Sequence, residues 1–123
     1  MLDITPVIIT YNEQDNLARS LERLRWAKRV IVLDSYSTDA TLEVARAFPN
    51  VEIVQHEFRS FADQWNHAIL HAGVTTDWIL RLDADYVLTE ALVQELARVS
   101  PVPEISAYRC PFTYCIDGRP LRG

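Results

Sequence analysis

Two aspartates separated by a single alanine, Asp83 and Asp85, follow an apolar run that predicts a buried strand. In an extended segment, side chains two residues apart point to the same side, so both carboxylates can face one point. Two carboxylates that close together repel each other unless a cation joins them or one takes up a proton. A hard divalent ion, Mg²⁺ or Mn²⁺, completed by substrate phosphates is the usual solution. The alternative is a solvated loop that caps the next segment.

Polar and aromatic residues also stand where the first two apolar runs end. Thr10, Tyr11 and Asn12 end the first run, and Asp34 ends the second. A tyrosine in that position can stack on a nucleobase, or it is an ordinary aromatic residue at a strand end. A carboxylate there can accept a hydrogen bond from a base N–H or a ribose hydroxyl, as in dinucleotide sites. The alternative for Asp34 is capping of the next helix.

Other candidate residues have less specific patterns. Arg81 lies inside the predicted strand that leads to Asp83, where its guanidinium can balance a phosphate or pair with Asp83 itself. The three histidines, His56, His67 and His71, lack the spacing of a metal site, although the last two are four residues apart on a predicted helix. Without an adjacent acidic base or a third ligand, we do not predict a zinc site there.

Four apolar runs, each too short for a helix, predict the buried strands that position these residues. They cover residues 6–10, 29–33, 51–54 and 78–82. Apolar residues at helical spacing follow each of the first three runs and predict inward helix faces. These residues are Leu17, Leu21 and Leu24; then Leu42, Ala45 and Phe48; then Phe61, Trp65, Ala68 and Ile69.

Capping signals mark the helix ends. Asn12 and Asp15 offer N-caps for the first helix, Gly73 ends the third, and Thr89 caps a last helix that runs to about residue 98. Residues 107–116 are predicted to be extended, with a hairpin turn signal at residues 117–118.

Strands that alternate with helices predict an α/β fold: a mostly parallel sheet with right-handed crossovers and helices on both faces. In such Rossmann-like sheets, ligands bind at the carboxyl ends of the strands. The candidate residues named above therefore stand at the ligand-binding edge of the predicted fold.

Composition predicts a single domain over residues 1–123. A hydrophobic fraction of 49% with 24% charged residues argues against disorder. A net charge of −5 without a basic stripe argues against nucleic-acid binding. No apolar run approaches the ~20 residues of a membrane span, and no basic signal-peptide start is present, so a cytoplasmic location is expected. The two cysteines, Cys110 and Cys115, are expected to be reduced.

Three segments taken together resemble the N-terminal half of a family 2 glycosyltransferase with the GT-A fold. They are "PVIITYNEQDNLARSLERL", "VIVLDSYSTDATLEVA" and "DWILRLDADYVL", and the likeness runs over residues 5–96. Two further segments, "FADQWNHAI" and "AYRCPFTYCIDGRPLRG", resemble the bacterial branch that adds sugars during lipopolysaccharide core or related glycan assembly. The resemblance implies a three-layer α/β/α nucleotide-diphospho-sugar transferase fold.

The resemblance also implies roles for individual residues. Thr10, Tyr11 and Asp34 would hold the base and ribose of a nucleotide-sugar donor, with a UDP-sugar as the first candidate. Asp83 and Asp85 would form the Asp-x-Asp pair, with Asp85 the better ligand for Mn²⁺ or Mg²⁺ and Asp83 nearer the ribose.

The resemblance extends to two polar residues of the third predicted helix, and the sequence departs from the family pattern at two other positions. Gln64 and Asn66 lie near polar helix positions of the family and would line the donor pocket; the alternative is that they are surface amides. Ser35 stands where much of the family has a second aspartate, often the one that reads the base, and Tyr36 stands where a glycine is usual. These two departures put recognition of uracil in question.

The carboxylate that activates the acceptor lies further along the chain in family members, and no acidic residue after Asp85 fits that role. We therefore expect a truncated, donor-binding half whose catalytic base is unidentified. The acceptor would be a glycan or a lipid-linked glycan, with peripheral contact at the inner face of the membrane. A homo-oligomer is expected, because Trp65, Trp78, Phe112 and Tyr114 would be exposed.

Two other functions remain open. One is a non-catalytic module that binds nucleotide sugars. The other is a phosphoryl-transfer enzyme with an Asp-x-Asp nucleophile, but that class expects the motif after the first strand and a threonine where Val87 stands.

Overall fold

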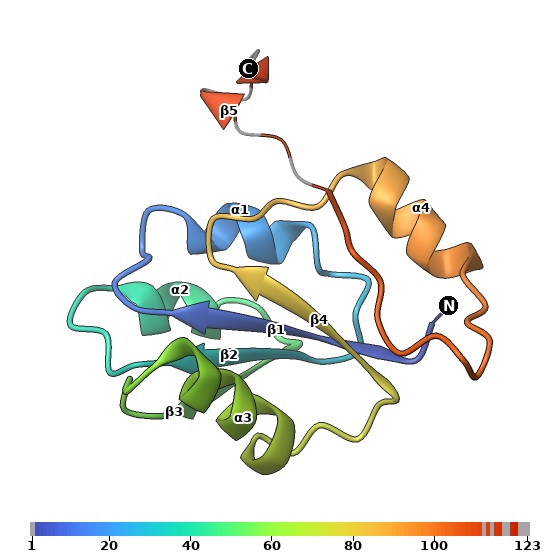
Figure 1. The fold of residues 1–123 in the computed structure, drawn as a ribbon. Helices are drawn as coiled ribbons and strands as arrows, with labels where there is room; N and C mark the ends of the chain where they lie inside the picture. The colour runs from blue at the N-terminus through green and yellow to red at the C-terminus, as the bar shows by residue number, and fades with distance from the viewer. Residues whose placement is uncertain (1, 112, 114, 117–118, 121–123) are drawn as a thin grey trace.

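The computed structural model describes residues 2–111, 113, 115–116 and 119–120 (Figure 1). Six strands occur in this part of the chain: β1 (Ile4–Thr10), β2 (Val30–Asp34), β3 (Val51–Gln55), β4 (Trp78–Asp83), β5 (Cys115–Ile116) and β6 (Arg119–Pro120). The helices there are α1 (Leu17–Glu22), α2 (Thr41–Arg46), α3 (Phe61–His71) and α4 (Glu90–Arg98).

The first four strands form one parallel sheet in the order β3-β2-β1-β4. Strand β1 is paired on both sides, with Val7 opposite both Ile31 of β2 and Arg81 of β4. The parallel sheet and its alternation with helices confirm the α/β prediction, and strand bounds agree with the predicted runs to within two residues.

Helices cover both faces of the sheet (Figure 1). Alternating side chains of the central strands pack against them. In β2, Val30 and Val32 join a core cluster that contains residues of α1, α2 and α4. Ile31 and Leu33 point to the opposite face and pack with α3 through Trp65. Because β2 is buried on both faces, it is a continuous apolar run rather than an alternating one.

Helix-end signals are confirmed at two places. Thr89 is the N-cap of α4, and its Oγ1 accepts a hydrogen bond of 3.1 Å from the backbone N–H of Leu92. Gly73 follows α3 with φ +74°, in the left-handed region where glycine has no Cβ penalty.

The start of α1 differs from the prediction. The helix begins at Leu17 with Asn16 as N-cap, and neither Asn12 nor Asp15 occupies that position. The reason is tertiary: the side chain of Asn12 accepts a hydrogen bond of 2.8 Å from the backbone N–H of Thr38 in the next loop. A side chain held by that loop cannot also cap the helix.

The buried face of α3 also differs from the prediction. Trp65 and Ala68 are buried as expected, but Phe61 and Ile69 are 66% and 54% exposed. Gln64 is fully buried instead. Ile69 follows Ala68 by one residue, about 100° around the helix, and therefore leaves the buried stripe. Phe61 belongs to the first turn, where its ring contacts Phe58 at 5.2 Å rather than the sheet.

The chain after α4 contains little regular structure among its described residues. Among the described residues of the predicted extended segment 107–116, Cys115 and Ile116 alone are in a strand, and β5 pairs antiparallel with β6. The turn signal at residues 117–118 lies outside the described residues, as do Phe112 and Tyr114. The exposure expected for Trp65 and Trp78 is wrong. Trp65 lies on the buried side of α3 and packs against the sheet, and Trp78 is half-buried against Tyr108.

Two further findings concern the described residues as a whole. Both cysteines are exposed and free. Within the described part of the chain, no helix combines the length and apolarity that crossing a membrane requires.

Candidate functional site

Three adjacent strands bring the predicted site residues to one edge of the sheet. Thr10 of β1 pairs with Asp34 of β2, and Ile9 of β1 pairs with Asp83 of β4. All three strands run in the same direction, so their carboxyl ends meet there. The structure therefore brings together the segments that follow β1, β2 and β4, as the sequence predicted.

Asp34 is fully buried at this edge and is occupied by hydrogen bonds from the protein. Its Oδ1 accepts from Thr10 Oγ1 at 2.7 Å and from Ser37 Oγ at 2.5 Å, and its Oδ2 accepts from the backbone N–H of Ser37 at 2.8 Å. Thr10 is itself buried. As the chain stands, these two residues hold the loop after β2, and direct contact with a nucleotide would require Ser37 to move.

The loop after β1 is fastened to the loop after β2 by side chain to backbone hydrogen bonds. The backbone N–H of Asn12 donates to Ser37 Oγ at 2.9 Å, and Asn12 Oδ1 accepts from Thr38 N at 2.8 Å. Further along, Gln14 Oε1 accepts from the backbone N–H of Ala40 at 2.9 Å. These bonds hold the two loops as one unit at the carboxyl edge.

Two tyrosines project from this unit into solvent. Tyr11 and Tyr36 are each 57% exposed, and each precedes a member of the bonded pair Asn12 and Ser37. Among the described residues, neither ring makes an aromatic or cation–π contact. Tyr11, the predicted base-stacking residue, is therefore accompanied in the next loop by a second exposed tyrosine, Tyr36. Sequence reasoning noted Tyr36 only because the resemblance implies a glycine there.

Asp83 and Asp85 are both exposed, but strand alternation does not orient them as a pair. Strand β4 ends at Asp83, and a turn follows in which the backbone N–H of Tyr86 donates to Asp83 O at 3.0 Å. The prediction that both carboxylates project from one extended segment is therefore wrong at Asp85. A tight turn can still present two carboxylates to one ion, and their role as metal ligands stays a prediction.

Ser20 of α1 holds this turn in place. Its fully buried hydroxyl lies 2.7 Å from Ala84 O and 2.6 Å from Tyr86 O, so one proton is shared between two carbonyl oxygens. Sequence reasoning missed Ser20, although a signal exists. It occupies the buried stripe between Leu17 and Leu21, where a polar residue needs a partner.

Arg81 is exposed, whereas a buried strand position was expected. The reason is that β4 is an edge strand of the sheet, and Arg81 alternates with Leu80 and Leu82, which face the core. Its guanidinium carbon lies 4.3 Å from the centre of the Trp65 ring, a cation–π contact.

A cleft of about 240 Å³ at this position is lined by Trp65, Arg81, Leu82, Asp83 and Tyr86. No ion pair joins Arg81 to Asp83 within the described residues. The guanidinium therefore keeps its charge open to a ligand beside the Asp-x-Asp segment.

Gln64 lies beneath the site rather than on its surface. Its Nε2 donates to Ser35 Oγ at 2.9 Å, and both side chains are buried. Its Oε1 is buried without a hydrogen-bond partner in the described part of the chain. Gln64 thus supports Ser35, and it reaches no ligand without rearrangement.

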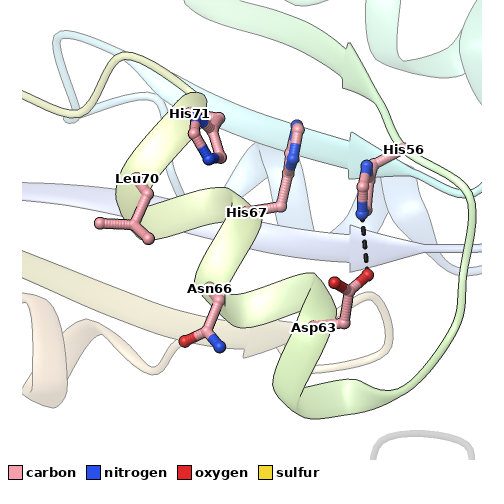
Figure 2. A pocket seen from close by; sticks show the side chains of 6 residues that line it. All are labelled: His56, Asp63, Asn66, His67, Leu70 and His71. Carbon is pink, nitrogen blue, oxygen red and sulfur yellow. Dashed lines mark hydrogen bonds and ion pairs between the residues drawn. The ribbon is translucent and has the colours of Figure 1, made fainter.

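Asn66 is exposed on the other side of α3, where it lines a second cleft of about 230 Å³ with the three histidines. Figure 2 shows the ring of His67 between those of His56 and His71. The His56 and His67 rings stack at 3.9 Å, and His56 Nε2 lies 2.8 Å from Asp63 Oδ2. Asn66 therefore belongs to this cleft and not to the one beside Asp83.

The pKa of His67 is shifted by its surroundings in the histidine cleft. Desolvation lowers the pKa of His67, and its neighbours His56 and His71 lower it further, against the opposing effect of Asp63. Within the described residues, no group of three or more potential ligands is arranged to hold a metal ion.

Curated relatives share the sequence pattern of this chain. The glycosyltransferase SunS, derived from the SPbeta prophage of Bacillus subtilis (strain 168), is 34% identical over 110 residues, which are 87% of this chain and 26% of the relative. An uncharacterized glycosyltransferase of Rickettsia typhi is 30% identical over 97 residues, covering 78% of this chain and 32% of the relative. The chain thus spans about a quarter to a third of the length of these relatives.

Solved structures share its fold. Residues 1–349 of TarS from S. aureus, in complex with UDP-GlcNAc, match with a TM-score of 0.65 at 21% identity, over 78% of this chain and 30% of that one. At this identity the likeness shows the fold, and it confirms the predicted three-layer GT-A arrangement.

The family model described as "Glycosyl transferase family 2" matches residues 5–114, which include every segment of the carboxyl edge described above. The match agrees with the expected family and extends past the predicted likeness at residue 96. The chain belongs to glycosyl transferase family 2.

Proposed function

We propose that this chain binds a nucleotide-diphosphate sugar and takes part in transfer of the sugar to a glycan or lipid-linked acceptor. The observation that carries the proposal is the strand register, which sets the Tyr11 loop, the Asp34 loop and the Asp83 turn side by side at one edge. The sheet order supports a direction for the donor. The nucleoside would lie over β1 and β2, and the diphosphate would lie toward β4.

The nucleoside end offers an exposed ring and a rigid support. Tyr11 can stack on the base, because its ring is 57% exposed and makes no aromatic contact among the described residues. Asn12, with its side-chain oxygen bonded to Thr38, and Asp34, bonded to Ser37, fix the backbone beneath it. Binding to a preorganised loop avoids the entropic cost of ordering that loop around the ligand.

The diphosphate end of the site offers carboxylates that suit a metal ion and a guanidinium that suits a phosphate. Arg81 presents an exposed guanidinium next to Asp83, and Asp83 and Asp85 present carboxylate oxygens. Two carboxylates suit Mg²⁺ or Mn²⁺, which take oxygen ligands and are completed by water and substrate phosphates. When bound, such an ion would neutralise the negative charge that develops on the departing nucleotide. Asp85 and Asp83 would hold it, and Arg81 would bind the phosphate.

Solved structures with the same fold support a nucleotide-sugar donor. TarS was crystallised with UDP-GlcNAc and with UDP, and its fold is shared here. A UDP-sugar is accordingly the first donor to test. The finer assignment to lipopolysaccharide-core-type assembly, with work at the inner face of the cytoplasmic membrane, forms part of the proposal and is supported by the sequence resemblance.

A second candidate is donor binding without efficient transfer. The sequence assigns no catalytic base to the described glutamates after Asp85, of which Glu90 and Glu95 belong to α4 and Glu104 belongs to the irregular segment after it. General-base catalysis needs a carboxylate within about 3 Å of the acceptor hydroxyl. Release of nucleotide from UDP-sugars with and without a glycan acceptor separates the two candidates, because only a transferase gains turnover from the acceptor.

Calorimetric titration with UDP, GDP and CDP, with and without Mn²⁺, tests the proposal. We expect binding that depends on Mn²⁺ in the wild-type chain and that weakens at least tenfold in Asp85→Asn. The matched control is Asp77→Asn, the same change at an exposed aspartate just before the opposite end of β4. Binding that ignores the metal would refute the metal assignment, and no binding of any nucleotide would refute the proposed function.

A further inference from the structure

Tyr36 has a backbone conformation that its residue type does not favour. Its φ is +57°, in the left-handed region where a β-carbon crowds the following carbonyl oxygen. Asn12 has a similar φ of +52°, but asparagine tolerates this region, and its side-chain oxygen accepts the Thr38 N–H there. The backbone conformation therefore explains why asparagine occupies position 12, but it does not explain why tyrosine occupies position 36.

Packing does not account for the tyrosine either. Its side chain is 57% exposed, and its ring takes part in no aromatic or cation–π contact of the described residues. Hydrogen bonds hold the residues on both sides of Tyr36. Ser37 donates to Asp34 through its backbone N–H and through its hydroxyl, and the backbone N–H of Ser35 donates to Thr10 O. A bulky residue kept in a strained, exposed position at a ligand edge indicates a use outside the fold itself.

The position of Tyr36 indicates which part of a ligand it meets. It follows β2, on the side of β1 away from β4, while Asp83 and Asp85 follow β4. A donor whose diphosphate lies toward β4 extends its base, and not its sugar, toward the loop after β2. Tyr11 stands in the neighbouring loop, fastened to that of Tyr36 by the hydrogen bond from Asn12 to Ser37.

We propose that Tyr36 is a second aromatic contact for the base of the donor nucleotide, held next to Tyr11 by the strained turn. This inference rests on the proposed function and adds to it a residue that contributes to base affinity. Tyr36 would contact the base next to Ser35, the position at which the resemblance implies an aspartate. A stacking contact accepts any base through its π-face, so this device gives affinity for the nucleoside with weak discrimination between bases.

The test combines binding and stability in one set of variants. Tyr36→Gly and Tyr36→Asn remove the ring and suit the left-handed backbone, and Tyr36→Phe keeps the ring but loses the hydroxyl. Each chain is titrated calorimetrically with UDP and, as a probe without a base, with pyrophosphate, both in the presence of Mn²⁺. Thermal melting of each chain without ligand gives its Tm.

We expect Tyr36→Gly and Tyr36→Asn to bind UDP more weakly by between about fivefold and a hundredfold, the usual worth of a stacked base. Their affinity for pyrophosphate stays unchanged, their Tm stays equal to or above that of the wild type, and Tyr36→Phe binds UDP like the wild type. A purely structural tyrosine would instead lower Tm when removed.

Unchanged UDP affinity in both ring-free variants, alongside clear binding by the wild-type chain, overturns this inference alone. A Tm several degrees lower in both variants overturns it as well, because the tyrosine would then serve the fold. Absence of UDP, GDP and CDP binding in the wild-type chain overturns the proposed function, and this inference with it.

Discussion

Replacing Ser20 by alanine removes one buried hydroxyl and leaves two backbone carbonyl oxygens, Ala84 O and Tyr86 O, without the proton that they share. The net worth of a typical hydrogen bond is about 0.5–1.5 kcal/mol, and a buried acceptor left without a donor costs about 1–3 kcal/mol. Ser20 is fully buried and Ala84 is nearly so, and the larger range therefore applies. Ser20→Ala should lower the free energy of unfolding by about 1–3 kcal/mol.

The corresponding change in melting temperature follows from the size of the chain. An unfolding entropy of about 2.1 cal/mol/K per residue gives about 0.26 kcal/mol/K for this chain of 123 residues. Ser20→Ala should therefore lower Tm by about 4–12 °C. Ser100→Ala is the matched control, because Ser100 is exposed and has no hydrogen bond among the described residues. The free energy of unfolding of Ser100→Ala should stay within about 0.5 kcal/mol of the wild-type value.

Melting followed by circular dichroism, together with urea unfolding, measures both variants. The reasoning fails if Ser20→Ala melts within about 2 °C of Ser100→Ala, since the buried hydroxyl would then contribute less than any ordinary hydrogen bond. A second consequence concerns the ligand: a loosened turn holds Asp83 and Asp85 less firmly, so Mn²⁺-dependent UDP binding should weaken in Ser20→Ala and stay unchanged in Ser100→Ala.

Two more predictions concern stability. Because the pKa of His67 is lowered, the unfolded chain binds protons more readily, and stability should fall as pH drops from 8 to 5.5 through the ordinary histidine range. Tm measured across that range should decline less steeply in His67→Gln, and equal slopes would contradict the assignment. Thr89→Ala should lower the free energy of unfolding by about 0.5–2 kcal/mol by removing the α4 cap. Thr75→Ala should lower it little, because Thr75 is exposed and makes no hydrogen bond within the described part of the chain. Urea unfolding compares the two, and equal losses would contradict the capping role.

Local patterns in the sequence were enough to predict the elements and their kind of sheet. The apolar run of β2 and the stripe of Leu17 and Leu21 on α1 depend only on residues a few positions apart. The stop at Gly73 and the cap at Thr89 depend on one residue and its immediate neighbours. Alternation of strands and helices then predicts parallel strands, and with them a ligand-binding edge at the carboxyl ends.

Tertiary structure alone decided which of the candidate polar groups face solvent and which support the others. Asp34 and Asp85 look alike in the sequence, since each belongs to an acidic segment at a strand end. Asp34 is nevertheless buried by Thr10, 24 residues away, while Asp85 is exposed in a turn held by Ser20, 64 residues from Ala84. Burial and hydrogen bonding depend on partners that only the folded chain brings near, and no periodicity within one segment contains that information.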